Sequence, residues 1–175
     1  MHVRWLVPIG VGTTCVAQIA FATQYMTIEQ AQHAAFPAAT AFAPATPALN
    51  AATYGASSGW SPRIWQAWAG DKTLGWLFED RVIGKSEAIT YALALDANGA
   101  VISLDVLDYR ESHGGEIRLA PWRKQFVGKT AHDTVALNQD IKNISGATLS
   151  CRHITEGVQR LLQVYERVLR VKVPG

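Results

Sequence analysis

The spacing of apolar residues near the C-terminal end is the feature that most constrains the fold. Between positions 151 and 169 these residues recur at intervals of three and four, with charged and amide side chains between them. Such spacing aligns them on one face of an α-helix. It predicts a helix of about five turns whose apolar stripe packs against another layer. The stripe comprises Cys151, Ile154, Val158, Leu161, Leu162, Tyr165, Val168 and Leu169.

Four upstream segments have the composition of β-strands and would supply that layer. Residues 64–69, 74–83, 88–96 and 101–109 are rich in β-branched and aromatic side chains. The sequences Gly-Asp-Lys and Asp-Ala-Asn-Gly, which suit hairpin turns, separate two of the pairs. We therefore predict an α+β fold in which an antiparallel β-meander packs against the long C-terminal helix.

Two shorter helices are also expected. Thr27 and Gln30 have the spacing of a capping box and begin a helix over 28–35. Pro121 is typical of a first helical turn, so a second short helix is expected over 122–126. This second helix lies before the loop that leads into the long helix.

The segment between the first short helix and the first strand has an unusual composition. From position 30 to position 62 it contains no Asp, Glu, Lys or Arg, and it is rich in Ala, Thr and Pro. Such a composition is typical of an extended or mobile segment. We therefore expect residues 23–59 to form a short helix and a lead-in outside the core, and residues 60–175 to form the functional domain.

The N-terminal end has the pattern of a secretory signal peptide. Arg4 precedes an apolar run over 5–22, which ends in the small-residue sequence Ala-Phe-Ala. Residues 1–22 are therefore expected to direct export, with cleavage after Ala22. The alternative is an uncleaved membrane anchor. Either outcome predicts a periplasmic location or one on the outer face of the cytoplasmic membrane.

Composition excludes several classes of function. There are 16 Lys and Arg residues against 14 Asp and Glu residues, so the chain lacks the excess of basic residues typical of nucleic-acid binding. The two cysteines cannot build a disulfide scaffold. No histidine pair has metal-ligand spacing, and no hydrolase or phosphate-loop motif is present. We expect neither a metal site nor a residue that is itself catalytic.

The six residues before the long helix are the most informative segment for function. In one interpretation they are an ordinary helix start, in which a serine or threonine side chain caps free N–H groups. In the other, an unshielded threonine hydroxyl carries a phosphoester, which the positive end of the helix stabilises. Arg152, one turn further on, would add charge pairing. The six residues are Ser145, Gly146, Ala147, Thr148, Leu149 and Ser150.

This hexapeptide resembles the S-G-A-T-x-S/T motif of the FMN-binding domain family, which occurs in flavin-bearing subunits of the sodium-pumping NADH:quinone reductase and of the Rnf complex. In that family an FMN transferase attaches FMN through its phosphate to the motif threonine, which corresponds to Thr148. The resemblance extends over residues 60 to 170. It implies covalent FMN, maturation by an FMN transferase, and membrane or periplasmic redox partners.

Two departures from the family pattern affect the expectations. Lys142 stands three positions before the motif serine, where the family usually has an acidic residue, so attachment is expected to be less efficient. The loop over 112–116 reads Ser-His-Gly-Gly-Glu where the family often has T-P-G-L-G. The surroundings of the flavin, and hence its potential, are expected to differ.

The glycine-rich loop over 109–115 has two interpretations. It is either a turn that leaves the sheet, or a segment whose backbone approaches the flavin ring while Arg110 or His113 stabilises the reduced anionic flavin. We expect Glu111 and His113 to act on the properties of the flavin rather than on its attachment.

These observations predict an exported electron-transfer flavoprotein that passes electrons between membrane or periplasmic partners. The sequence favours a carrier, or a component of a redox system, over a stand-alone enzyme. Two alternatives remain open at this stage. One is a flavin-dependent reductase with its own small substrate, and the other is a cofactor-free exported binding module in which the hexapeptide is only a helix cap.

Overall fold

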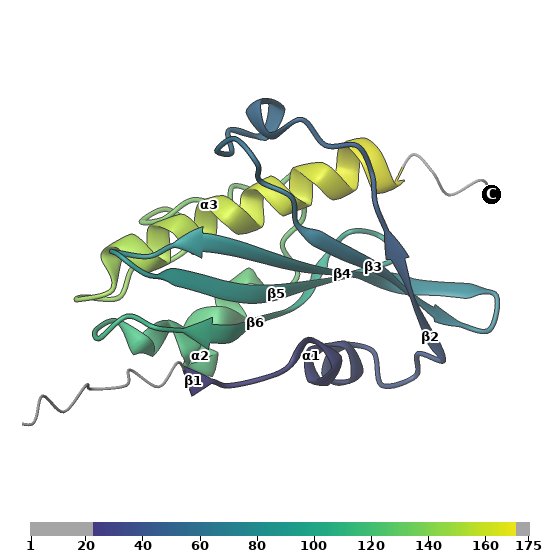
Figure 1. The fold of residues 1–175 in the computed structure, drawn as a ribbon, viewed down its shortest axis with the longest axis horizontal. Helices are drawn as coiled ribbons and strands as arrows, with labels where there is room; N and C mark the ends of the chain where they lie inside the picture. The colour runs from purple at the N-terminus through teal and green to yellow at the C-terminus, as the bar shows by residue number, and fades with distance from the viewer. Residues whose placement is uncertain (1–22, 171–175) are drawn as a thin grey trace, which may run out of the picture.

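A computed structural model describes residues 23–170. It shows a six-stranded antiparallel sheet with a long helix on one face and a short helix on the other (Figure 1). This arrangement confirms the predicted α+β class. The expected signal peptide, residues 1–22, lies outside the described residues.

The sheet contains the predicted meander and adds an edge strand on each side. The spatial order is β1-β6-β5-β4-β3-β2, with every pair antiparallel. Its strands are β1 (Thr23–Gln24), β2 (Ala41–Ala45), β3 (Arg63–Ala69), β4 (Lys72–Ile83), β5 (Ala88–Asp96) and β6 (Val101–Tyr109). The strands β3 to β6 confirm the four predicted segments. Gly70 and Gly99 lie in the two expected turns with φ of 58° and 88°, a left-handed conformation that favours glycine.

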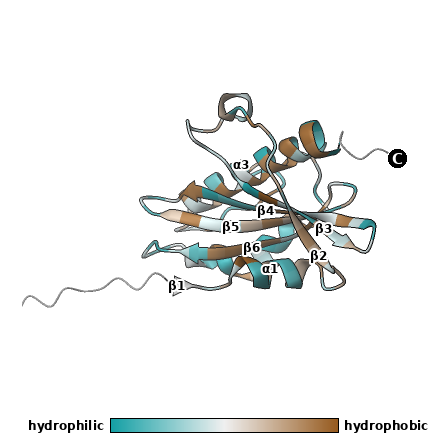
Figure 2. Ribbon diagram, turned by 45° about the vertical axis from the view of Figure 1, so that its right-hand side comes forward, coloured by the Kyte–Doolittle hydropathy of each residue, from teal (hydrophilic) through white to brown (hydrophobic). Residues whose placement is uncertain are grey.

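The long helix α3 (Thr148–Val164) continues as a single π-helical turn, η4 (Tyr165–Leu169). Its apolar stripe packs against the sheet as predicted. Ile154, Val158 and Leu161 are each 0% exposed, whereas Val168 is half-buried. Figure 2 shows the resulting alternation of hydrophobic and hydrophilic colour along the helix. Cys151 is part of the buried stripe, and burial raises the pKa of its thiol. The helix and the sheet therefore enclose the main core.

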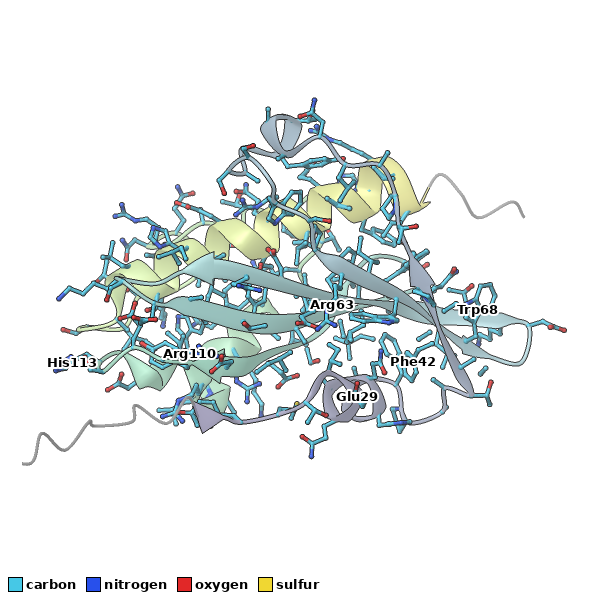
Figure 3. The ribbon with its side chains drawn as sticks, viewed as in Figure 1. Glu29, Phe42, Arg63, Trp68, Arg110 and His113 are labelled. Carbon is cyan, nitrogen blue, oxygen red and sulfur yellow. The ribbon has the colours of Figure 1, made fainter. Side chains whose placement is uncertain are left out.

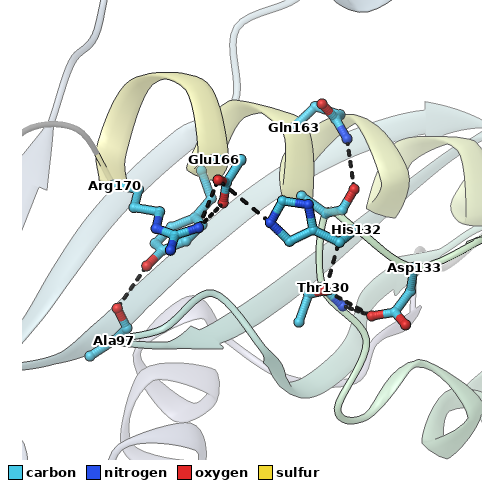
Figure 4. A network of polar contacts seen from close by, with 9 residues as sticks. Ala97, Thr130, His132, Asp133, Gln163, Glu166 and Arg170 are labelled. Carbon is cyan, nitrogen blue, oxygen red and sulfur yellow. Dashed lines mark hydrogen bonds and ion pairs between the residues drawn. The ribbon is translucent and has the colours of Figure 1, made fainter.

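Polar contacts fix the C-terminal end of α3 (Figure 4). The Tyr165 hydroxyl donates to the carbonyl of Ala97 over 2.7 Å, and the Gln163 side chain donates to the carbonyl of Ala131 over 3.0 Å. Arg170 contacts both carboxylate oxygens of Glu166, at 2.7 and 2.9 Å. The Tyr165 bond ties this end of the helix to the turn between β5 and β6, and the Gln163 bond ties it to the loop after η3, whereas the Arg170 contact lies within the helix itself.

The lead-in does not lie outside the core, and this part of the sequence-based prediction is wrong. The helix α1 (Ile28–Ala35) has the predicted bounds and capping box, with Thr27 Oγ1 accepting from the N–H of Gln30. It packs on the face of the sheet opposite α3, and Phe36, just after it, is only 4% exposed. The strand β2 then pairs with β3. Pro44 is tolerated in β2 because an edge strand does not need every N–H for pairing.

Short helical turns connect the remaining elements. After β2 comes η1 (Ala51–Tyr54), and after β6 the chain forms η2 (Gly115–Arg118), α2 (Ala120–Arg123) and η3 (Lys124–Phe126). The predicted helix over 122–126 is thus present as α2 followed directly by η3. Over residues 23–170, no helix is both long and apolar enough to cross a membrane.

Replacing Phe36 by alanine tests whether the lead-in belongs to the core. Because the ring is buried against Ala67, Leu77 and Ala94, Phe36→Ala should lower the free energy of unfolding by about 3–5 kcal/mol. Denaturant titration measures this change, with Ala38→Gly at an exposed neighbouring position as the control. A change as small as the control's would show that the segment contributes nothing to the core.

Candidate functional site

A cavity of about 980 Å³ lies where β6 ends and α3 begins. Its walls come from the turn between β4 and β5, the loop after β6, η2, and the start of α3, with Tyr25 from the N-terminal segment. The volume is in the range of small-molecule and cofactor sites. Figure 3 shows His113 of this cavity at one end of the molecule and Trp68 toward the other.

The hexapeptide forms one wall of this cavity, and it is not an ordinary helix cap. Ala147 is the N-cap residue of α3, and no side chain caps the helix. The hydrogen-bond ladder of the helix begins at Cys151, whose N–H donates to the carbonyl of Ala147 over 2.9 Å. The N–H groups at the start of a helix carry its partial positive charge. This end of α3 therefore presents positive potential and an exposed Thr148 hydroxyl to the cavity.

The other hexapeptide residues have distinct surroundings. Ser145 and Gly146 are exposed, Leu149 is 41% exposed, and Ser150 is buried. Gly146 has φ of 86°, but a Cβ atom at this position would meet nothing within 4 Å. The glycine is therefore required by its backbone conformation and not by a lack of space.

Gly114 brings the loop after β6 into contact with the start of α3. It has φ of 83°, and a Cβ atom here would lie 2.9 Å from the Tyr109 hydroxyl and 3.0 Å from the Cβ of Ala147. The Tyr109 hydroxyl donates to the carbonyl of His113, which closes the loop around this glycine. Burial raises the pKa of Tyr109, although a hydrogen bond with Ser150 lowers it in part, so the phenol remains a donor.

Glu111 joins the end of β6 to the turn between β4 and β5. Its carboxylate accepts from the N–H groups of Ser86 and Glu87 over 2.7 and 2.9 Å, and from the Ser86 hydroxyl over 3.2 Å. Burial raises the pKa of Glu111, but the N–H groups of Glu87, Ser86 and Lys85 lower it by more, so the net pKa lies below its usual value. Glu111 thus shapes the cavity by fixing two of its walls.

The remaining predicted site residues are only partly brought together. His113 lines the cavity and is exposed, with its Nδ1 atom 2.9 Å from the Ser112 hydroxyl. Arg110 does not line this cavity and instead pairs with Asp108 over 2.9 Å. Arg152 is exposed and lies one turn along α3, outside the cavity lining.

Sequence reasoning missed several residues of the cavity wall, and Arg118 and Tyr25 are two of them. The guanidinium carbon of Arg118 lies 4.2 Å from the centroid of the Tyr25 ring, and its Nε donates to the carbonyl of Gly115 over 2.9 Å. Among residues 23–170, no carboxylate lies within ion-pair distance of Arg118. The cavity therefore contains a half-buried cation that a bound anion can pair with. The N-terminal segment joins the site only through tertiary structure.

The described part of the chain holds no cluster of three or more His, Cys, Asp or Glu side chains suited to a metal ion.

Comparison with known proteins supports the resemblance seen in the sequence. The FMN-binding domain family matches residues 84–163. Over 94 residues the chain is 23% identical to one of the subunits of the Na(+)-translocating ferredoxin:NAD(+) oxidoreductase complex of Acetobacterium woodii, a match that covers 49% of this chain and 45% of that protein.

The role of Gly114 is tested by two alanine variants. Gly114→Ala combines an unfavourable positive φ with close contacts to Tyr109 and Ala147, and should destabilise the protein by roughly 1–3 kcal/mol. Gly128 has a similar φ of 81° but open space around it, so Gly128→Ala isolates the backbone cost. Equal losses of unfolding free energy would show that the close approach of the loop to α3 is not required.

The contacts of Glu111 predict a pH-dependent stability difference between the wild type and Glu111→Gln. Because the folded pKa lies below the unfolded one, the carboxylate contributes fully above the usual pKa of about 4.3 and loses its contribution as the pH falls through the folded value. The variant should be less stable at neutral pH, and the difference should shrink below about pH 4. Denaturant unfolding across this range, with Glu116→Gln as the control, measures it. A pH-independent difference would contradict the assignment.

Proposed function

We propose that this chain, whose residues 84–163 match the FMN-binding domain family, is an electron-transfer flavoprotein with FMN attached through its phosphate to Thr148. The observation that carries the proposal is the position of Thr148. Its exposed hydroxyl stands on the wall of the cavity, at the start of a 17-residue helix that no side chain caps.

The residues around Thr148 fit a phosphodiester. Such a group keeps one negative charge and needs hydrogen-bond donors or positive charge nearby. The free N–H groups of the first turn of α3 offer both. Arg118, which lines the same cavity, has no carboxylate partner among the described residues, so its guanidinium group is available to an anion. The alternative of a cofactor-free module relied on the hexapeptide being a cap, and α3 has no side-chain cap.

The cavity also fits a flat ring system. Tyr25, Leu119 and Leu149 line it and are 42%, 58% and 41% exposed, which gives apolar surface beside the polar groups. Gly114 and Gly115 allow the backbone to approach a ring closely. When bound, FMN supplies the redox chemistry, while Arg118 and His113 provide charge and polarity that tune its potential.

A role in passing electrons between proteins agrees with the match to a component of a ferredoxin:NAD(+) oxidoreductase complex. The match covers less than half of that protein, and the partners of this chain given next are our own proposal. We infer membrane or periplasmic redox partners, and an FMN transferase for maturation. Export by the N-terminal segment would bring the protein to the compartment in which these partners lie.

Replacing Thr148 tests the attachment directly. Thr148→Ala removes the acceptor oxygen and should abolish covalent FMN, whereas Thr148→Ser keeps an oxygen and should be modified at least in part. The alanine variant should fold normally, because the Thr148 side chain is exposed and caps no N–H group. Each variant is made together with an FMN transferase, and covalent flavin is read from intact mass and from fluorescence in a denaturing gel.

Ser145→Ala is the matched control, because this exposed hydroxyl lines the same cavity three residues earlier. It should retain covalent FMN. Covalent FMN that persists in Thr148→Ala would place the attachment elsewhere. A folded wild type that takes up no flavin would favour the binding module.

A further inference from the structure

We infer that Asn143 is a positioning residue, which holds the Thr148 hydroxyl in the orientation needed for attachment of FMN. This inference rests on the proposed function of Thr148. Asn143 lies before the hexapeptide, and its side-chain Nδ2 donates a hydrogen bond to Thr148 Oγ1 over 3.0 Å. No other side-chain hydrogen bond to Thr148 occurs among residues 23–170.

Two hydrogen bonds fix the backbone of Lys142, the residue directly before Asn143. The N–H of Lys142 donates to the side-chain oxygen of Gln125 over 2.8 Å, and the Trp122 indole donates to the carbonyl of Lys142 over 2.8 Å. Trp122 is itself only 4% exposed and packs against Phe126, with ring centroids 5.2 Å apart. The core therefore fixes the backbone next to Asn143, and the Asn143 side chain in turn fixes the position of the Thr148 hydroxyl.

Stability alone does not explain an asparagine at this position. Its side-chain oxygen Oδ1 is buried, and it has no hydrogen-bond partner within the described part of the chain. A buried acceptor without a partner costs free energy, whereas an apolar side chain of similar size would avoid the cost. The amide nitrogen is the part of this side chain that makes a contact, and the contact is with the proposed acceptor oxygen.

The direction of this hydrogen bond suits the chemistry of attachment. A threonine hydroxyl has two lone pairs and one hydrogen, and the amide N–H occupies one lone pair. The hydrogen and the second lone pair of Oγ1 therefore face away from Asn143, and the exposed Thr148 side chain can present them to an enzyme. The amide also stabilises negative charge that develops on Oγ1 as the proton leaves.

The step is a phosphoryl transfer from a pyrophosphate-linked flavin dinucleotide, bound by the transferase. The bond between Thr148 Oγ1 and the flavin-side phosphorus forms, and the bond from that phosphorus to the bridging pyrophosphate oxygen breaks. A nucleoside monophosphate leaves, and the hydroxyl proton passes to a base of the transferase. No oxidation or reduction occurs. Asn143 takes part only by holding and polarising Oγ1.

The test measures the kinetics of a purified FMN transferase with the unmodified protein as acceptor. Asn143→Leu and Asn143→Ala should lower kcat for attachment about tenfold, which corresponds to about 1.4 kcal/mol. KM for the acceptor protein should change little, because the surface that the transferase meets is kept. The thermal unfolding temperature of Asn143→Leu should not fall, because the variant removes a buried acceptor that has no partner.

Gln139→Ala is the control, because this exposed amide side chain lies in the same loop and, among residues 23–170, makes no hydrogen bond to Thr148. It should leave both kinetic constants unchanged. A wild-type kcat in both Asn143 variants would overturn the inference while leaving Thr148 as acceptor. A loss of kcat that parallels a loss of folded protein would assign Asn143 a structural role instead. A wild type that accepts no FMN would refute the proposed function itself.

Discussion

The burial of the apolar stripe of α3 against the sheet is the interaction on which the rest of the structure depends. Ile154, Val158 and Leu161 are fully buried there, and Tyr165 and Gln163 fix the far end of the helix by hydrogen bonds. Once the helix is held along this length, its first turn has only one possible place, beside the end of β6. The exposed Thr148 is therefore presented by a rigid element.

The cavity exists because segments distant in the sequence meet at this end of the sheet. Glu111 joins the turn between β4 and β5 to the end of β6, and Gly114 allows the next loop to touch Ala147. Arg118 then supplies a cation to the cavity wall, and Asn143 contacts the Thr148 hydroxyl from the loop before α3. Together these contacts define one pocket, which contains a helix N-terminus, a cation and apolar surface. This combination fits the flavin nucleotide that we propose for the site.

The sequence predicted elements whose signals are local. The three-and-four spacing indicated α3, segments rich in β-branched and aromatic residues indicated β3 to β6, and glycine-containing turns marked two hairpins. It failed for β2, because a charge-free Ala- and Pro-rich segment carries no information about pairing with a strand some twenty residues later. Tyr25, Arg118 and Asn143 are part of the site through tertiary contacts that have no local pattern. Arg110 was a different error, because it follows the end of β6 and pairs with Asp108 instead of lining the cavity.

Peptide mapping determines whether Thr148 carries FMN. Trypsin cleaves after Lys142 and Arg152, so digestion of protein made together with an FMN transferase releases residues 143–152 as one peptide, with hydroxyls at Ser145, Thr148 and Ser150. This peptide should gain the mass of FMN less one water, and fragmentation should locate the added mass on Thr148. An unmodified peptide from a folded protein, or FMN located on either serine, would contradict it.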